Sequence, residues 1–202
     1  MLLVIDSATT ACSVALVEGS HVVDERHEVV GRGHAERLIP MIEELLAGRR
    51  PSAILVDCGP GSFTGVRVGL AAAHGLAIGG GVPLTGYSSM AAIAAMGADA
   101  ESVGVALHAG HGQLFVQSYG PGPIAPLDEL QSLPPDAAAA AIAAPLVLGS
   151  GAQMLVTIRG HGEAVDALPR ASAAAGLPEA LRSLAPRPIY GRAPDAKPMA
   201  VQ

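Results

Sequence analysis

The feature that most constrains the fold is a glycine-rich turn between a buried strand and an apolar helix. The apolar run Ala53–Val56 leads into Gly59-Pro60-Gly61-Ser62-Phe63-Thr64-Gly65. Glycines permit positive φ and close backbone packing, and Ser62 or Thr64 can cap the helix that follows. The pattern predicts a tight strand-to-helix connection with five structural turn residues: Gly59, Pro60, Gly61, Ser62 and Gly65. Free N–H groups there could also hold an anion, although the spacing is neither a dinucleotide fingerprint nor a P-loop.

The helix expected from Thr64 to Ile78 has almost no polar face, because only Arg67 and His74 interrupt it. A helix that is apolar nearly all round is buried on two sides, and its Gly and Ala residues permit close helix approach. The preceding helix, Ala35–Leu46, also has a wide apolar stripe. We expect the two helices to form a partner-binding pair; alternatively, a second lobe of the same chain covers them. The expected interface residues are His34, Leu38, Met41, Ile42, Leu45, Arg67, Gly69, Leu70, Ala72, Ala73 and Leu76.

The order of elements predicts an α/β chain with two lobes. Three strands, a helix, a strand, a helix, a strand and a short helix fill the first half, and a similar pattern starts near residue 100. We place the lobes at residues 1–100 and 101–202. In the second lobe the sequence predicts strands over 103–107, 113–119 and 146–148, and helical pieces over 136–143, 162–174 and 178–184.

Charge, cysteine content and hydropathy limit the classes of function that we expect. The net charge is −6 and no Lys/Arg cluster is visible, so unaided binding to a phosphate backbone is not expected. Cys12 and Cys58 each lie in an apolar run and are interpreted as small buried residues rather than a disulfide or a metal pair. The most apolar stretch, Val66–Leu84, is too interrupted to span a membrane, and no basic leader is visible. We therefore expect a cytoplasmic protein.

Residues Gly59–Leu70 closely resemble the signature of the TsaB (YeaZ-type) family, Gly-Pro-Gly-Ser-Phe-Thr-Gly followed by an apolar residue, Arg, an apolar residue and Gly. The resemblance is dense over residues 1–90 and thin from about 120 to 185. One departure is the turn Leu107–Gly112, where the family usually carries Asp-Ala-Arg. Further matching segments are Leu3–Thr9, His34–Pro40, Val82–Ser89, Pro188–Arg192 and Asp195–Pro198.

The resemblance implies an actin/hexokinase-like ATPase (ASKHA) fold, with two lobes that are each built on a mixed sheet with flanking helices. It also implies a non-catalytic role in making threonylcarbamoyladenosine at position 37 of tRNAs that read codons starting with A. Family members pair through their two N-terminal helices with the catalytic subunit TsaD, or with themselves when TsaD is absent. The ATPase TsaE joins the complex, and tRNA is contacted indirectly through it.

The residues themselves indicate no catalytic, cofactor-binding or metal site. Kinases of this fold class hold ATP phosphates on a glycine-containing turn after the first strand, whereas Asp6 is followed by Ser7-Ala8-Thr9-Thr10 and is expected to cap that turn. TsaD-type metal sites use two histidines four residues apart on one helix, but His34 and His74 each stand alone. His108 and His111 lie in a turn. The alternatives left open are an independent metallopeptidase-like or kinase-like enzyme and a self-contained homodimer.

Overall fold

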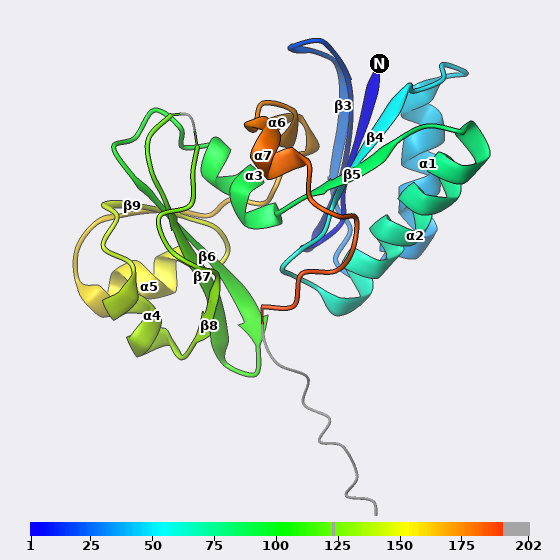
Figure 1. Ribbon diagram of the computed structural model, residues 1–202. Coiled ribbons are helices and arrows are strands. Elements are labelled where there is room, and N and C mark those ends of the chain that lie inside the picture. Colours follow the sequence, from blue (N-terminus) through cyan, green and yellow to red (C-terminus); the bar gives the residue numbers. More distant parts are fainter. Residues whose placement is uncertain (123, 192–202) are drawn as a thin grey trace, which may run out of the picture.

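The computed structural model describes residues 1–122 and 124–191 and shows two lobes side by side (Figure 1). The first lobe is built on a mixed five-stranded sheet in the order β3-β2-β1-β4-β5. Strand β1 pairs parallel with β4 and antiparallel with β2, and β4 pairs parallel with β5. The carboxyl ends of β1 and β4 therefore meet at one edge of the sheet. The strands are β1 Leu2–Asp6, β2 Ala11–Glu18, β3 His21–Val29, β4 Ala53–Asp57 and β5 Leu84–Tyr87.

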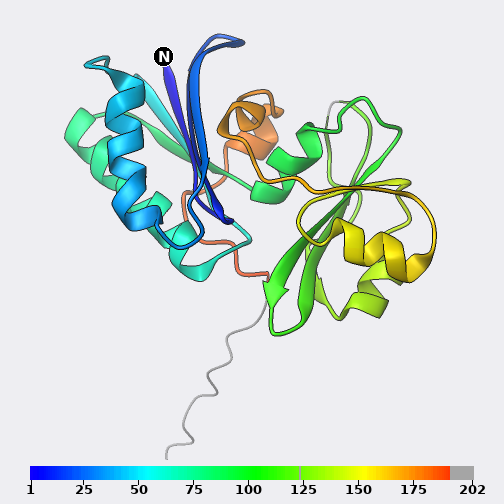
Figure 2. The ribbon, with the colours of Figure 1, turned by 180° about the vertical axis from the view of Figure 1, so that it is seen from behind.

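Helices α1 (His34–Leu46) and α2 (Phe63–Gly80) cover the outer face of this sheet (Figures 1 and 2). Apolar residues of α1 recur at helical spacing, so one stripe faces the sheet while charged residues face outward. The Ser62 hydroxyl caps α2 by accepting a hydrogen bond from the Gly65 N–H at 3.2 Å. The core between helices and sheet is aliphatic and includes both cysteines, which are buried and unpaired as expected.

The inner face of the same sheet is covered by a short helix from the end of the chain, α6 (Ala171–Ala175), and α7 (Glu179–Arg182) packs against β5. Helix α3 (Ser89–Ala95) packs between α6 and strands of the second sheet. The chain thus leaves the first lobe after α3 and returns to it. At the point of return the Ala171 N–H donates to the Ser13 hydroxyl at 3.0 Å, and Arg170 forms an ion pair with Glu25. One aliphatic and aromatic core is shared by this layer and the second sheet.

The second lobe holds another mixed five-stranded sheet, in the order β10-β9-β6-β7-β8, with helices α4 and α5 on its outer face. Strands β6, β9 and β10 are parallel, and β7 is antiparallel to both β6 and β8. Two mixed sheets with flanking helices confirm the actin/hexokinase-like fold class. The elements are β6 Val103–Gly110, β7 Gln113–Tyr119, β8 Gln131–Leu133, α4 Pro135–Ala141, β9 Leu146–Leu148, α5 Ala152–Arg159 and β10 Glu163–Val165.

One expectation for the second half is wrong, and two further elements have no counterpart in the sequence analysis. The helical piece expected over 162–174 is strand β10, an extended segment and then the short α6. Strand β8 and helix α5 were not predicted. The three residues of β8 are too few to show an alternating pattern, and the mixed run 152–159 has only a weak apolar face.

The last described residues, 184–191, form an extended segment that we term the C-terminal strap. Leu184 exchanges backbone hydrogen bonds with Gly86 of β5, and the Ile189 N–H donates to the Cys58 carbonyl at 2.7 Å. A Cβ on Gly191 would lie 2.5 Å from a ring carbon of Phe115 in β7. The strap therefore runs from the edge of the first sheet, past the start of α2, to the second lobe (Figure 1).

Candidate functional site

The glycine turn packs directly on the turn that follows β1. A Cβ on Gly61 would lie 2.1 Å from the Ala8 carbonyl oxygen, and one on Gly65 would lie 2.1 Å from the Ser7 carbonyl oxygen. The Ser62 N–H donates to the Ala8 carbonyl at 2.6 Å, and the Ser7 hydroxyl donates to the Gly65 carbonyl at 2.9 Å. Glycine is thus required at Gly61 and Gly65 for space, because any side chain would enter the neighbouring backbone.

Three of the six N–H groups of the glycine turn donate to acceptors inside the chain. Those of Gly59, Ser62 and Gly65 donate to Asp57, Ala8 and Ser62 respectively. Gly59 has a φ of +90°, and the Gly59–Pro60 peptide bond is cis. Anion binding at this turn stays a prediction, and half of the donors that would support it are engaged within the chain.

Two carboxyl groups lie buried beneath the turn, at the adjacent ends of β1 and β4. Asp6 accepts hydrogen bonds from the Ala8 N–H, as the sequence predicted, and from the Tyr87 hydroxyl at 2.8 Å. Burial raises the pKa of Asp6 to about 6. Burial, together with the nearby Asp6, raises the pKa of Asp57 well above its usual range, and Asp57 Oδ2 has no hydrogen-bond partner among the described residues. Both side chains are about 1% exposed, so they are sealed from any substrate in this conformation.

Eight of the eleven predicted interface residues lie inside the chain's own core rather than on its surface. Each is less than about a tenth exposed, because the inner stripes of α1 and α2 face the sheet. These eight residues are therefore not available on the surface of the chain. The three others are partly exposed: Arg67, Ala72 and Leu76. Use of the helix pair by a partner stays a prediction. The eight buried positions are His34, Leu38, Met41, Ile42, Leu45, Gly69, Leu70 and Ala73.

The outward face of the helix pair is nevertheless apolar along α2. Ile78 is 82% exposed, and Ile39 of α1 is 49% exposed. Ala71, Gly75 and Gly79 are exposed at four-residue spacing on α2, and a Cβ on either glycine would meet nothing within 4 Å. Sequence reasoning could not separate this outer stripe from the buried one, because α2 is apolar on both.

The start of α2 carries an arrangement that sequence analysis missed. The Arg67 guanidinium carbon lies 3.2 Å from the centre of the Phe63 ring and 5.6 Å from that of Tyr190 in the strap. Arg67 Nη2 also donates to the Tyr190 hydroxyl at 2.8 Å, and His74 Nε2 lies 3.2 Å from the Pro186 carbonyl oxygen. The Phe63–Arg67 contact joins residues four apart on one helix, a spacing that the sequence shows. No local pattern relates Arg67 to Tyr190 or His74 to Pro186, because each pair is more than a hundred positions apart.

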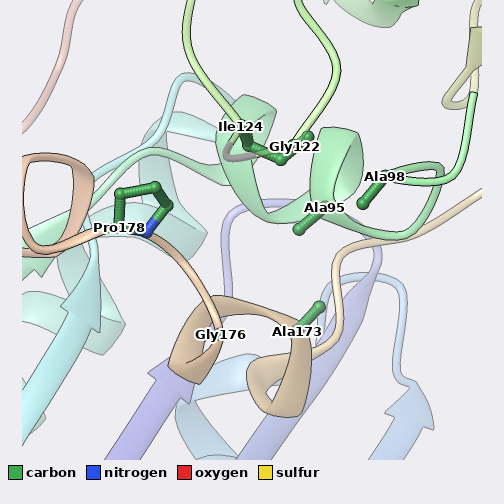
Figure 3. A pocket seen from close by; sticks show the side chains of 7 residues that line it. All are labelled: Ala95, Ala98, Gly122, Ile124, Ala173, Gly176 and Pro178. Atoms are coloured by element: carbon green, nitrogen blue, oxygen red, sulfur yellow. The ribbon is translucent and has the colours of Figure 1, made fainter. Parts of the chain in front are cut away.

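A cavity of about 380 Å³ opens between α3 and α6, where the two lobes meet. Figure 3 shows side chains from both helices lining it, together with Gly122, Ile124 and Pro178. Every described residue that lines the cavity is apolar, so none of them supplies a group for acid–base, nucleophilic or metal chemistry.

His108 lies in strand β6 rather than in the expected turn, whereas His111 lies in the β6–β7 turn with a φ of 51°. Both residues are exposed. Within residues 1–122 and 124–191 no group of three or more His, Cys, Asp and Glu is placed to hold a metal ion. None of the helices over these ranges is both long and apolar enough to cross a membrane.

Comparison with known proteins places the chain in a family. A family model described as TsaD, tRNA N6-adenosine threonylcarbamoyltransferase, matches residues 21–127. The TsaB protein of Escherichia coli is 41% identical over 98 residues, which is 46% of this chain and 42% of that protein. An uncharacterized protein of Mycobacterium tuberculosis is 33% identical over 220 residues, covering 99% of this chain and 95% of the relative. This chain thus spans about two fifths of the E. coli protein and nearly all of the mycobacterial one.

A solved structure agrees with these matches. The crystal structure of a Pseudomonas aeruginosa protein described as similar to peptidase YEAZ superposes with a TM-score of 0.80. The superposition covers 95% of this chain and 99% of that chain, at 29% identity. The sequence matches and the two-lobed fold agree on one family: the chain is a member of the TsaB/YeaZ family of tRNA threonylcarbamoyladenosine biosynthesis proteins.

Proposed function

We propose that this chain is the non-catalytic subunit that binds TsaD and supports its transfer of threonylcarbamoyl to adenosine 37 of tRNAs reading codons that start with A. It acts in the cytoplasm, with TsaE as a third component, and pairs with itself when TsaD is absent. The observation that carries the proposal is the exposed apolar stripe on α2, together with the half-exposed Ile39 on the neighbouring helix α1.

The shape of that stripe favours a helical partner. Ala71, Gly75 and Gly79 present no side chain larger than a methyl group along this stripe of α2, so another helix can approach it closely. Ile78 lies next to this stripe and is 82% exposed, an arrangement typical of an apolar anchor at an interface. Burying such a side chain fully stabilises a complex by about 1.5–3 kcal/mol.

The packing at the end of β1 supports the non-catalytic part of the proposal. Kinases of this fold class hold phosphate groups against the turn after the first strand, whereas here the backbone of the glycine turn packs against that turn. Gly61 and Gly65 lie so close to Ser7 and Ala8 that not even a Cβ fits between the two turns. Binding a phosphate there would require the glycine turn to move away.

The test is co-purification of the chain with TsaD of the same organism on a sizing column, using Ala71→Glu and the matched control Ala140→Glu. Both alanines are exposed on helices, Ala71 on α2 and Ala140 on α4. A glutamate at position 71 would bury a charge in the proposed interface, so we expect Ala71→Glu to abolish co-elution at micromolar concentration. Ala140→Glu should co-elute like wild type. Ala72→Glu would be a poorer choice, because Ala72 packs against the core.

Other results would select the alternatives. Separate elution of wild-type chain and TsaD contradicts the proposal. A stoichiometric metal ion or nucleotide, with hydrolysis or phosphoryl transfer by the chain alone, favours an independent enzyme of this fold. A dimer that resists both Ala71→Glu and added TsaD favours the self-contained homodimer.

A further inference from the structure

The chain separates its charges, and the described residues of one region include no carboxylates. Residues 58–98, 102–127 and 180–194 hold none of the 18 Asp and Glu residues. These stretches supply α2 with its glycine turn, the β6–β7 hairpin and the strap. The acidic side chains of the first lobe are instead concentrated on β3 and α1: Asp24, Glu25, Glu28, Glu36, Glu43 and Glu44. The carboxylates of this chain, whose net charge is −6, are therefore distributed unevenly between its regions.

The three carboxylate-free stretches meet where the strap crosses from one lobe to the other. Figures 1 and 2 show the end of the strap beside the β6–β7 hairpin and near the start of α2. Gly191 packs against Phe115 of that hairpin, and Ile189 bonds to the residue before the glycine turn. We term this region the seam surface and define it by Phe63, Arg67, Arg187 and Tyr190.

The seam surface carries exposed aromatic rings in a chain that has few. Of its three tyrosines and two phenylalanines, the other three members are buried, whereas Phe63 is 69% exposed and Tyr190 is 62% exposed. Arg67 holds the two rings in place through stacking and a hydrogen bond to the Tyr190 hydroxyl. The Arg187 side chain is exposed on the same strap.

We propose that the seam surface binds single-stranded RNA, with unpaired bases of the tRNA stacking on Phe63 and Tyr190 and its phosphates contacting Arg187 and Arg67. The inference rests on the proposed function, because the net negative charge requires a partner such as TsaD to hold most of the RNA. Flat exposed rings beside arginines are the platform on which unpaired bases stack. An acidic peptide would be drawn to the arginines but would leave both ring faces in water.

The test measures the affinity of the chain–TsaD complex for a fluorescent transcript of a tRNA that reads a codon starting with A, at several salt concentrations. Phe63→Leu and Tyr190→Leu keep an apolar side chain but remove the flat ring, and Arg187→Gln removes one charge. The matched control is Arg50→Gln, an exposed arginine that precedes β4 and so lies at the opposite end of the sheet from the glycine turn. Sizing and urea unfolding confirm that each variant folds and associates.

The variants should differ in their effects on tRNA affinity and on its dependence on salt. We expect each leucine variant to weaken tRNA binding about fivefold or more, without changing the dependence of the affinity on salt. Arg187→Gln should weaken binding and lower the slope of log affinity against log salt by about one, because one phosphate contact is lost. Arg50→Gln should change neither quantity.

Two outcomes overturn the inference while leaving the proposed function intact. In the first, the leucine variants and Arg187→Gln all bind tRNA with wild-type affinity and slope. In the second, the variants lose TsaD, yet the complexes that do form bind tRNA normally, which would make the seam surface a protein contact. If the wild-type chain does not bind TsaD, the proposed function fails, and the isolated chain is titrated with the same tRNA at low salt. The inference is then overturned if the wild-type chain does not bind the tRNA, or if the variants bind it as tightly as wild type.

Discussion

Asp6 and Asp57 lie in the core of the first lobe with no ion pair to either among the described residues. Desolvation disfavours a buried charge, and Asp6 and Asp57 disfavour each other's ionisation. The hydrogen bonds from Ala8 and Tyr87 to Asp6 only partly offset this cost. A neutral side chain of the same shape should therefore fit better at neutral pH.

Asp6→Asn should stabilise the protein at neutral pH and have little effect at pH 4. The pKa of Asp6 is about 6 in the folded state and about 3.9 when unfolded. The Asp6 carboxyl keeps its proton to a higher pH in the folded state than in the unfolded state. Its contribution to the free energy of unfolding is therefore fully present below pH 4 and is lost as the pH rises through 6. In the variant, the amide oxygen can accept from Ala8 while the amide nitrogen donates to the Tyr87 hydroxyl. We expect its advantage in unfolding free energy to grow by about 2–3 kcal/mol between pH 4 and pH 8.

Urea unfolding at each pH measures that advantage. Asp136→Asn, a substitution at an exposed carboxyl at the start of α4, serves as the control and should follow the wild-type profile. An Asp6→Asn advantage that is the same at pH 4 and pH 8 would show that ionisation of Asp6 does not limit stability.

Two glycines of the same region should respond in opposite ways to alanine. Gly61→Ala places a methyl group 2.1 Å from the Ala8 carbonyl oxygen, so the two turns must separate. We expect a loss of about 1–3 kcal/mol in unfolding free energy. Gly75 is exposed inside α2 with open space around it, so Gly75→Ala should gain about 0.5–1 kcal/mol by improving helix propensity. Thermal unfolding of both variants distinguishes these outcomes, and equal effects would contradict the proposed close packing of the turns.

At the scale of elements, local patterns predicted the first lobe well. The alternation of Ala11–Val17 and the helical spacing of Leu38, Met41 and Leu45 depend only on near neighbours, so they can be read without the tertiary structure. The surface of α2 could not be predicted in this way. Leu70 is buried and Ile78 exposed although both are large and apolar, because the position of the sheet decides which stripe is covered.

The C-terminal strap is an element whose role depends wholly on distant residues. It covers Cys58, whose Sγ lies 3.7 Å from the Ala185 carbonyl oxygen. Burial, with a contribution from Asp57, raises the pKa of the Cys58 thiol to about 12, so hardly any thiolate is present at neutral pH. Removal of the strap should expose this thiol to water and lower its pKa toward 8.5.

A chain that ends at Ser183 should therefore react with a thiol reagent at Cys58 at pH 8, whereas the full chain should react slowly. Cys12 lies in β2 and stays buried in both forms, so Cys58→Ala in the shortened chain should remove the fast reaction. Circular dichroism verifies that the shortened chain is folded. Slow reaction of the folded, shortened chain would mean that other segments protect Cys58.

At the scale of the whole molecule, the first lobe is discontinuous in sequence. The inner face of its sheet is covered by α6, which follows the entire second lobe, and the shared core joins Val4 and Leu55 to Ala171 and Ala174. The boundary predicted near residue 100 lies where the chain enters the second lobe. No local pattern shows that residues 171–191 return to the first lobe. That return depends on pairing across more than eighty residues, such as the bonds between Gly86 and Leu184.

A fragment of residues 1–100 should consequently fail to fold cooperatively, although it contains all five strands of the first sheet. Without α6 and the strap, the inner face exposes an apolar surface that includes Val4, Ala15 and Leu55. We expect broad urea unfolding and binding of a hydrophobic dye. Joining residues 171–191 to this fragment through a flexible Gly/Ser linker should restore a sharp transition, because the missing layer is returned without the second lobe. A sharp transition in the 1–100 fragment alone would instead establish residues 1–100 as an autonomous folding unit.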